Sequence, residues 1–311
     1  MFNTIAVTLI PVGFVILVGY FAGRRFFKSS DRTMITKLVL TWTLPALLFA
    51  GVLKTPRADL LNYHTPLIFL VGLMVPFLAV LLICRYIFRY DRRAATLKAG
   101  ILAFPDMVFM GIPILNQLMG PTSLFPILIA NLIPSLIIIP LTTLMLNLGS
   151  GDSKGSAKSV LLNTALKAIR QPQVVAPFLA FALVVFNVPV PVFVIKSFEL
   201  MGSPTTGLSL FVVGLIVAEE KVRLTALVTF DSLMKLLAQP AFMALTVLLF
   251  GVSGNLAREA ILLAGIPSAV ITSMFAEEFG VLTSESSTAV LETRVLSFAT
   301  IPLLIALTQH L

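Results

Sequence analysis

Residues 103–113 read Ala-Phe-Pro-Asp-Met-Val-Phe-Met-Gly-Ile-Pro, and residues 264–270 read Ala-Gly-Ile-Pro-Ser-Ala-Val, each inside a long apolar segment. Proline removes a backbone donor and pushes away the carbonyl group four residues earlier, so both stretches predict interrupted helices. Irregular backbone within a bilayer is tolerated only where protein or a water-filled cavity surrounds it. The exposed amides and positive helix ends at such a break suit an anion.

Prolines also repeat along the chain. Five in the second half follow five in the first at offsets of 159 to 164 residues. The pairs are Pro11 and Pro172, Pro45 and Pro204, Pro76 and Pro240, Pro105 and Pro267, and Pro140 and Pro302. One such proline could be a simple kink, but five pairs at nearly the same offset indicate a duplicated unit. Paired interrupted helices in two equivalent halves mark the substrate site of membrane carriers, so the pattern points to a transporter.

The composition is that of a membrane protein. Hydrophobic residues make up 58% of the 311 residues, charged residues 12%, and the mean hydropathy is +1.02. An ordinary soluble domain has about 25% charged residues. The net charge of +8 does not indicate nucleic-acid binding, because the basic residues lie in short clusters between apolar segments. The single cysteine, Cys84, cannot form an internal disulfide.

Windows of about 20 apolar residues predict ten transmembrane helices. They cover residues 3–22, 34–53, 65–87, 97–118, 123–146, 170–188, 192–217, 224–250, 257–279 and 286–309. A hydrophilic cytoplasmic linker at residues 147–171 separates a first five-helix repeat (1–146) from a second (172–311). The expected fold is an all-α polytopic membrane protein with broken crossover helices in spans 4 and 9.

The basic residues predict the orientation. Sixteen of the 22 Lys and Arg residues, Lys98 among them, fall in one set of loops, and three fall in the opposite set. Cytoplasmic loops carry an excess of Lys and Arg, so both termini are expected outside the cytoplasm, at the cell (inner) membrane. Because each repeat has an odd number of spans, the second enters from the opposite side. Inverted repeats of this kind are the usual basis of alternating access.

Four motifs occur in order along the chain: residues 44–49 (Leu-Pro-Ala-Leu-Leu-Phe), 104–106 with 111–113, 203–204 with 208–214, and 266–267. At these motifs the chain resembles the auxin efflux carrier family of membrane transporters, in the bacterial branch that includes malonate carriers. The resemblance covers almost the whole chain. It implies crossed broken helices, a scaffold and a moving domain, often a homodimer, and substrates that bear carboxylates. The chain departs from the family pattern at Asp106, where asparagine is frequent, and at Glu292 and Arg294, where small or hydroxyl residues are usual.

The predicted substrate site lies near the bilayer midplane. Its residues are Pro105, Asp106, Gly111, Pro113, Asn131, Gly265, Pro267, Ser268 and Arg294. A charge at that depth costs at least about 2.5 kcal/mol, so it usually faces a cavity or a partner. Arg294 is the candidate anchor for a substrate carboxylate, because a guanidinium can bind it through two parallel hydrogen bonds. Asp106 and Glu292 are the candidates for proton coupling.

Three of the charged pairs have structural interpretations. Asp106 and Arg294 could form an ion pair with no role in binding. The other two pairs, Asp231 with Lys235 and Lys196 with Glu199, lie close enough in sequence to pair on one helix face, and a structural role is expected for both.

Other classes of function have less support in the sequence. Its only histidines, His64 and His310, sit at predicted outer ends, and no catalytic constellation, metal cluster or nucleotide motif is visible, so no enzyme, metal or cofactor is predicted. A channel is the more serious alternative, since broken helices also line pores. The sequence therefore predicts a secondary active transporter of small organic anions, proton-coupled, with malonate or a similar dicarboxylate as substrate. The alternative is an anion channel, or a carrier for auxin-like or other monocarboxylates.

Overall fold

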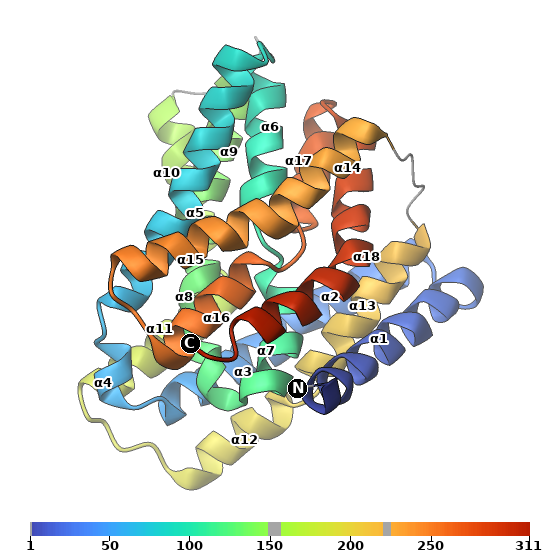
Figure 1. The fold of residues 1–311 in the computed structure, drawn as a ribbon. Coiled ribbons are helices and arrows are strands. Elements are labelled where there is room, and N and C mark those ends of the chain that lie inside the picture. Colours follow the sequence, from blue (N-terminus) through green and yellow to red (C-terminus); the bar gives the residue numbers. More distant parts are fainter. Residues whose placement is uncertain (1, 149–156, 220–224) are drawn as a thin grey trace. The chain divides into compact units, whose positions relative to one another are not determined.

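The computed structural model describes residues 2–148, 157–219 and 225–311 (Figure 1). The chain divides into two compact units, which are described separately. Unit 1 comprises residues 1–63, 108–129 and 169–219, and unit 2 comprises residues 64–107, 130–168 and 220–311. Secondary structure in the described ranges is helical, apart from one isolated β-bridge. Each unit draws segments from both predicted repeats.

Unit 1 is built around the N-terminal helices and the segment 169–219. Its elements are α1 (Phe2–Arg25), α2 (Ser29–Leu38), η1 (Val39–Thr43), α3 (Leu44–Lys54), α4 (Arg57–Leu60), α7 (Ile112–Met119), η4 (Pro121–Ser123), α11 (Pro172–Val185), α12 (Val192–Gly202) and α13 (Thr205–Glu219). Three elements run across the boundaries between the two units: the π-helical segment η3 (Met107–Gly111), helix α8 (Leu124–Ile133) and, by its last residue, helix α10 (Ala157–Ile169).

Unit 2 holds both helix breaks that the sequence predicts. Its elements are α5 (His64–Leu82), η2 (Ile83–Ile87), α6 (Arg92–Ala103), η5 (Pro134–Ile138), α9 (Ile139–Leu148), α10 (Ala157–Ile169), α14 (Ala226–Leu233), η6 (Met234–Ala238), α15 (Gln239–Leu249), α16 (Gly254–Ala264), α17 (Ile271–Phe279) and α18 (Thr283–Leu307). Helix α10 lies inside the predicted linker, and linker residues 149–156 lie outside the described residues.

Six helical segments of the described chain are long and apolar enough to cross a membrane. They are Ser29–Lys54, His64–Ile87, Pro121–Leu148, Val192–Glu219, Ala226–Leu249 and Thr283–Leu307, which correspond to predicted spans 2, 3, 5, 7, 8 and 10. A seventh is added if Ser159–Ile169 and Pro172–Val185, which meet at an angle of 65°, form one span. Spans 4 and 9 are interrupted, as predicted. The ten-helix inverted repeat stays a prediction.

Four prolines inside the spans are preceded by π-helical segments. Four such segments end two residues before a proline: η1 before Pro45, η3 before Pro113, η5 before Pro140 and η6 before Pro240. In three of them the N–H of the residue preceding the proline donates to the carbonyl group five residues earlier: Leu44 to Val39, Ile139 to Pro134 and Gln239 to Met234. Because the proline ring displaces the carbonyl group four residues before it, the wider turn keeps the helix continuous.

Helices α1 and α13 of unit 1 lie side by side at close range (Figure 1). A Cβ atom added at Gly19 would collide with the backbone oxygen of Phe211, and one at Gly214 with that of Ile16. Small residues permit this backbone approach, which is how transmembrane helices pack in lipid.

Two ion pairs also join segments of unit 1. Arg32 Nη1 lies 2.9 Å from Glu219 Oε2, and Lys54 pairs with Glu199. The predicted pair of Lys196 with Glu199 is therefore wrong in its partner. The reason is that Lys54, at the C-terminal end of α3, reaches the same carboxylate from another helix.

Candidate functional site at the crossing of two broken helices

The first break follows from the sequence around α6. Asp91 caps this helix by accepting the N–H of Ala94 at 2.7 Å, and the helix ends at Ala103, two residues before Pro105. Phe104 is extended, because a proline disfavours helical geometry in the residue that precedes it. The second break is similar: α16 ends at Ala264, and the helical path resumes only at α17. The predicted interruptions at Pro105 and Pro267 are both found.

The two breaks pair with each other through the backbone. The N–H of Asp106 donates to the carbonyl oxygen of Pro267 at 2.8 Å, and the N–H of Ala269 donates to that of Phe104 at 2.9 Å. Pro105 and Ser268 thus form an isolated antiparallel bridge. In lipid an unsatisfied backbone group costs several kcal/mol, so this crossing supplies the partners that the broken helices need. Each break serves as the hydrogen-bonding partner of the other.

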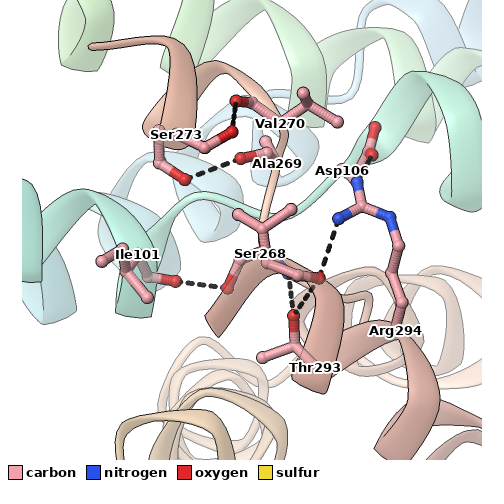
Figure 2. Close-up of polar contacts among 10 residues, drawn as sticks. Ile101, Asp106, Ser268, Ala269, Val270, Ser273, Thr293 and Arg294 are labelled. Carbon is pink, nitrogen blue, oxygen red and sulfur yellow. Dashed lines mark hydrogen bonds and ion pairs between the residues drawn. The ribbon is translucent and has the colours of Figure 1, made fainter. Parts of the chain in front are cut away.

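Ser268 fixes the crossing to two helices. Its hydroxyl donates to the carbonyl oxygen of Ile101 at 2.6 Å, and its backbone N–H donates to Thr293 Oγ1 at 3.2 Å. Figure 2 shows these contacts around the buried Ser268 side chain. The predicted site residue is therefore at the crossing, and Thr293 is a partner that the sequence did not single out.

Arg294 reaches the same crossing from α18 (Figure 2). Its Nη2 donates to Asp106 Oδ2 at 2.7 Å, its Nη1 donates to the carbonyl oxygen of Val290 at 2.8 Å, and the residue is 1% exposed. Its Nε has no hydrogen-bond partner among the described residues. The pairing of Asp106 with Arg294, considered in the sequence as a structural ion pair, is confirmed as a contact. The guanidinium retains donor capacity for a further acceptor.

Lys235 and Gln239 connect the two half-helices at their C-terminal ends. Lys235 Nζ donates to the carbonyl oxygen of Ala264 at 2.9 Å and also to Gln239 Oε1. Gln239 Nε2 in turn donates to the carbonyl oxygen of Ala103 at 3.0 Å. Ala103 and Ala264 are the last residues of α6 and α16, where carbonyl groups lack helical partners and a cation is favoured. One lysine and one glutamine thus supply a hydrogen-bond donor to the last carbonyl group of each half-helix.

The predicted pair of Asp231 and Lys235 is wrong. Asp231 instead accepts from Lys98 at 2.6 Å, while Lys235 is directed to Ala264 and Gln239. The physical reason is that the π-helical segment η6 begins at Met234. The α-helical spacing of four residues does not continue through Lys235, so the two side chains do not share a face. Lys98, counted among the cytoplasmic loops in the sequence, is buried in α6.

Five of the nine predicted site residues meet in unit 2. They are Pro105, Asp106, Pro267, Ser268 and Arg294. Gly265 lies at the end of α16 beside them, where a Cβ atom would collide with the side chain of Leu304. Asn131 is buried in α8, and its carbonyl group accepts from Ser135. Gly111 and Pro113 belong to unit 1, in η3 and α7. Glu292, the second coupling candidate, accepts from Ser232 at 3.2 Å.

Sequence comparison agrees with this architecture. The family model described as "Membrane transport protein" matches residues 4–305. The Escherichia coli (strain K12) "Uncharacterized transporter YfdV" is 30% identical over 299 residues, which cover 93% of each chain. The Rhizobium meliloti (strain 1021) "Putative malonate transporter" is 23% identical over 298 residues, covering 94% of this chain and 92% of that protein. Auxin efflux carrier component 3 of Arabidopsis thaliana is 29% identical over 139 residues, covering 42% of this chain and 22% of that protein.

Six long apolar helical segments in the described chain, together with two interrupted helices that cross, are the architecture of a polytopic membrane protein. Within that class the chain belongs to the membrane transport protein family, which includes the auxin efflux carriers. It is therefore a membrane transporter, and the resemblance stated from the sequence motifs is confirmed.

Proposed function

We propose that this protein is a secondary active transporter of small organic anions, with malonate or a similar dicarboxylate as its substrate. The observation that carries the proposal is the buried guanidinium of Arg294 at the crossing of two broken helices, with an Nε group that has no partner in the described chain. A guanidinium keeps its charge when buried and binds carboxylates in bidentate geometry. The malonate assignment also draws on the name of the 23% identical relative.

Asp106 gives the site a simple coupling mechanism. When Asp106 is ionised, its carboxylate occupies one side of the Arg294 guanidinium at 2.7 Å. When a proton binds to Asp106, the ion pair loses its Coulomb attraction and Arg294 becomes available to a substrate carboxylate. Anion binding and proton binding then favour each other, as proton-coupled uptake requires. Backbone hydrogen bonds from Asp106 to Pro267 and from Ala269 to Phe104 join the two breaks beside this pair.

Alternating access and membrane placement complete the proposal. A carrier that alternates needs two bodies able to move relative to one another, and the division of the chain into two compact units supports this part of the proposal. The excess of Lys and Arg in one set of loops supports an inner-membrane location with both termini outside the cytoplasm. A homodimer, which the family resemblance implies, is part of the same proposal.

Uptake of radiolabelled malonate into proteoliposomes, with an imposed pH gradient and unlabelled organic acids as competitors, tests this function. We expect saturable, gradient-driven uptake that is lost in Arg294→Gln. Arg57→Gln, which removes an exposed arginine in unit 1, is the matched control and should transport like the wild type. Currents that neither saturate nor respond to competitors would favour a channel. Normal kinetics in Arg294→Gln would remove Arg294 as the anchor.

A further inference from the structure

A second buried cluster of charges lies in unit 2, away from the contacts described at the crossing. Lys98 Nζ of α6 lies 2.6 Å from Asp231 Oδ2 of α14 and 3.0 Å from Glu285 Oε2 of α18. The Lys98 side chain is 2% exposed, that of Asp231 11% and that of Glu285 37%. We call these three residues the Lys98 triad. It joins three helices that are far apart in the sequence.

The triad has one carboxylate more than it has cations. With all three groups ionised it carries a net charge of −1, and two of its members are largely removed from water. Desolvation penalises such an unbalanced buried charge. A second carboxylate beside the same cation disfavours the ionised form of the buried Asp231 carboxyl group, so a proton is favoured there. A single proton on Asp231 makes the triad neutral.

The triad is exposed to water on one side and is connected to the interior of unit 2 on the other. Glu285, in the first turn of α18, is the member with substantial exposure, so water can reach the triad at this residue. On the interior side, Ser232 follows Asp231 in α14 and donates to Glu292 Oε2 at 3.2 Å. Glu292 lies seven residues beyond Glu285 on α18, which is about 10 Å along a helix. The carboxylates of Asp231, Glu285 and Glu292 therefore extend from a solvated end of α18 toward Arg294, two residues beyond Glu292 on the same helix.

Few other titratable groups surround the triad. Cys84 of η2 is close enough to Asp231 and Lys98 to interact electrostatically with both, and Lys98 Nζ lies 5.8 Å from the ring centroid of Tyr90. The neighbouring charges are directed elsewhere or exposed. Lys235 of η6 bonds to Ala264 and Gln239, Arg93 of α6 donates to the carbonyl oxygen of Phe279, and Glu277 and Glu278 of α17 are exposed.

We propose that Lys98, Asp231 and Glu285 form a proton-binding site through which protons exchange between water and the interior of the carrier. The proton binds to a carboxylate oxygen of Asp231, and its release leaves both carboxylates ionised against Lys98. The part of this inference that concerns transport rests on the proposed function, in which a proton binds to Asp106. The protons that leave the triad would be those that bind there. The proton-binding part concerns the triad alone.

Infrared difference spectroscopy tests the proton site without any substrate. Spectra of the purified protein are compared between mildly acidic and mildly alkaline pH, where exposed carboxyl groups stay ionised. The wild type should show a protonated carboxyl band that is lost in Glu285→Gln and in Asp231→Asn. Glu278→Gln, which removes an exposed carboxylate of α17, should keep the band. Retention of the band in both triad variants would overturn the proposal. Glu285→Gln alters a partly exposed side chain, so it remains informative if Asp231→Asn fails to fold.

Transport by the same variants tests the connection to uptake. In Glu285→Gln, malonate counterflow between equal internal and external pools should persist, because it needs no net exchange of protons. Net malonate uptake driven by a pH gradient should be lost. Equal loss of counterflow and net uptake would contradict a proton-exchange role. A wild type that lacks malonate counterflow, yet loses the infrared band in the triad variants, would refute the malonate assignment and leave the proton site supported.

Discussion

Arg294 and Asp106 are the two residues on which the proposed chemistry depends. Both are buried, their ion pair is 2.7 Å long, and removing either partner leaves a desolvated charge. Loss of one member of a buried pair typically destabilises a protein by about 3–5 kcal/mol. The same property makes the pair suitable for exchange, because a substrate carboxylate can replace Asp106 beside Arg294 without leaving the cation bare. A structural role of the Asp106–Arg294 ion pair is therefore compatible with the proposed role of Arg294 in binding the substrate.

Asp106→Asn should flatten the pH dependence of malonate counterflow. In the wild type, counterflow should rise as the pH falls, because protonation of Asp106 releases Arg294. Asparagine cannot ionise, so the variant should show the same rate across the pH series. Initial counterflow rates in proteoliposomes with equal internal and external pH measure this effect. Glu278→Gln, which alters an exposed carboxylate, should keep the wild-type profile. An Asp106→Asn profile that also matches the wild type would remove Asp106 from the coupling mechanism.

At the level of the helices, the breaks at Pro105 and Pro267 could be predicted because proline chemistry acts locally. Their mutual pairing could not, since the hydrogen bonds join Asp106 to Pro267 and Ala269 to Phe104 across a large part of the chain. The hydrogen bond from Lys235 to Gln239 was not predicted, because the π-helical segment η6 changes which residues share a helix face. Lys98 was assigned to a loop because its carboxylate partners lie on segments distant in sequence.

Gln239→Leu should destabilise unit 2. The substitution leaves the carbonyl oxygen of Ala103 without its side-chain donor and removes an acceptor from Lys235. A buried polar group left unsatisfied costs about 1–3 kcal/mol, so the midpoint of thermal unfolding in detergent should fall. Leu237→Ala in the same π-helical segment alters an exposed side chain and should shift the midpoint less. Equal shifts in the two variants would mean that the bridge between the half-helices contributes no stability.

Gly214→Val should destabilise the packing of α1 against α13 in unit 1. A side chain at this position meets the backbone oxygen of Ile16, and backbone atoms cannot move aside without separating the helices. Gly207→Val, on the same helix, is the control, because a Cβ atom there meets open space. The yield of monodisperse protein in detergent and its thermal midpoint measure the difference. Comparable values for Gly214→Val and Gly207→Val would contradict the role of close approach.

At the scale of the whole molecule, the proline offsets predict a duplication, which stays a prediction, whereas the two compact units could not be predicted from the sequence. Proximity in sequence favours the division into halves at residues 147–171, whereas contacts in space group spans 1, 2, 6 and 7 into unit 1. Most of spans 3, 5, 8, 9 and 10 falls in unit 2, together with the first part of span 4. Each unit combines corresponding spans of the two halves, as expected if equivalent parts of the predicted repeats associate.

Direct binding of radiolabelled malonate to purified protein, compared across three variants, tests the central claim that Arg294 anchors the substrate carboxylate. We expect binding to be lost in Arg294→Gln and in Arg294→Gln/Asp106→Asn. Binding should be retained in Asp106→Asn, which removes the competing carboxylate. The double variant carries no unpaired charge at this site, so its loss of binding cannot be ascribed to a bare carboxylate. Wild-type affinity for malonate in the double variant would contradict the proposed carboxylate site.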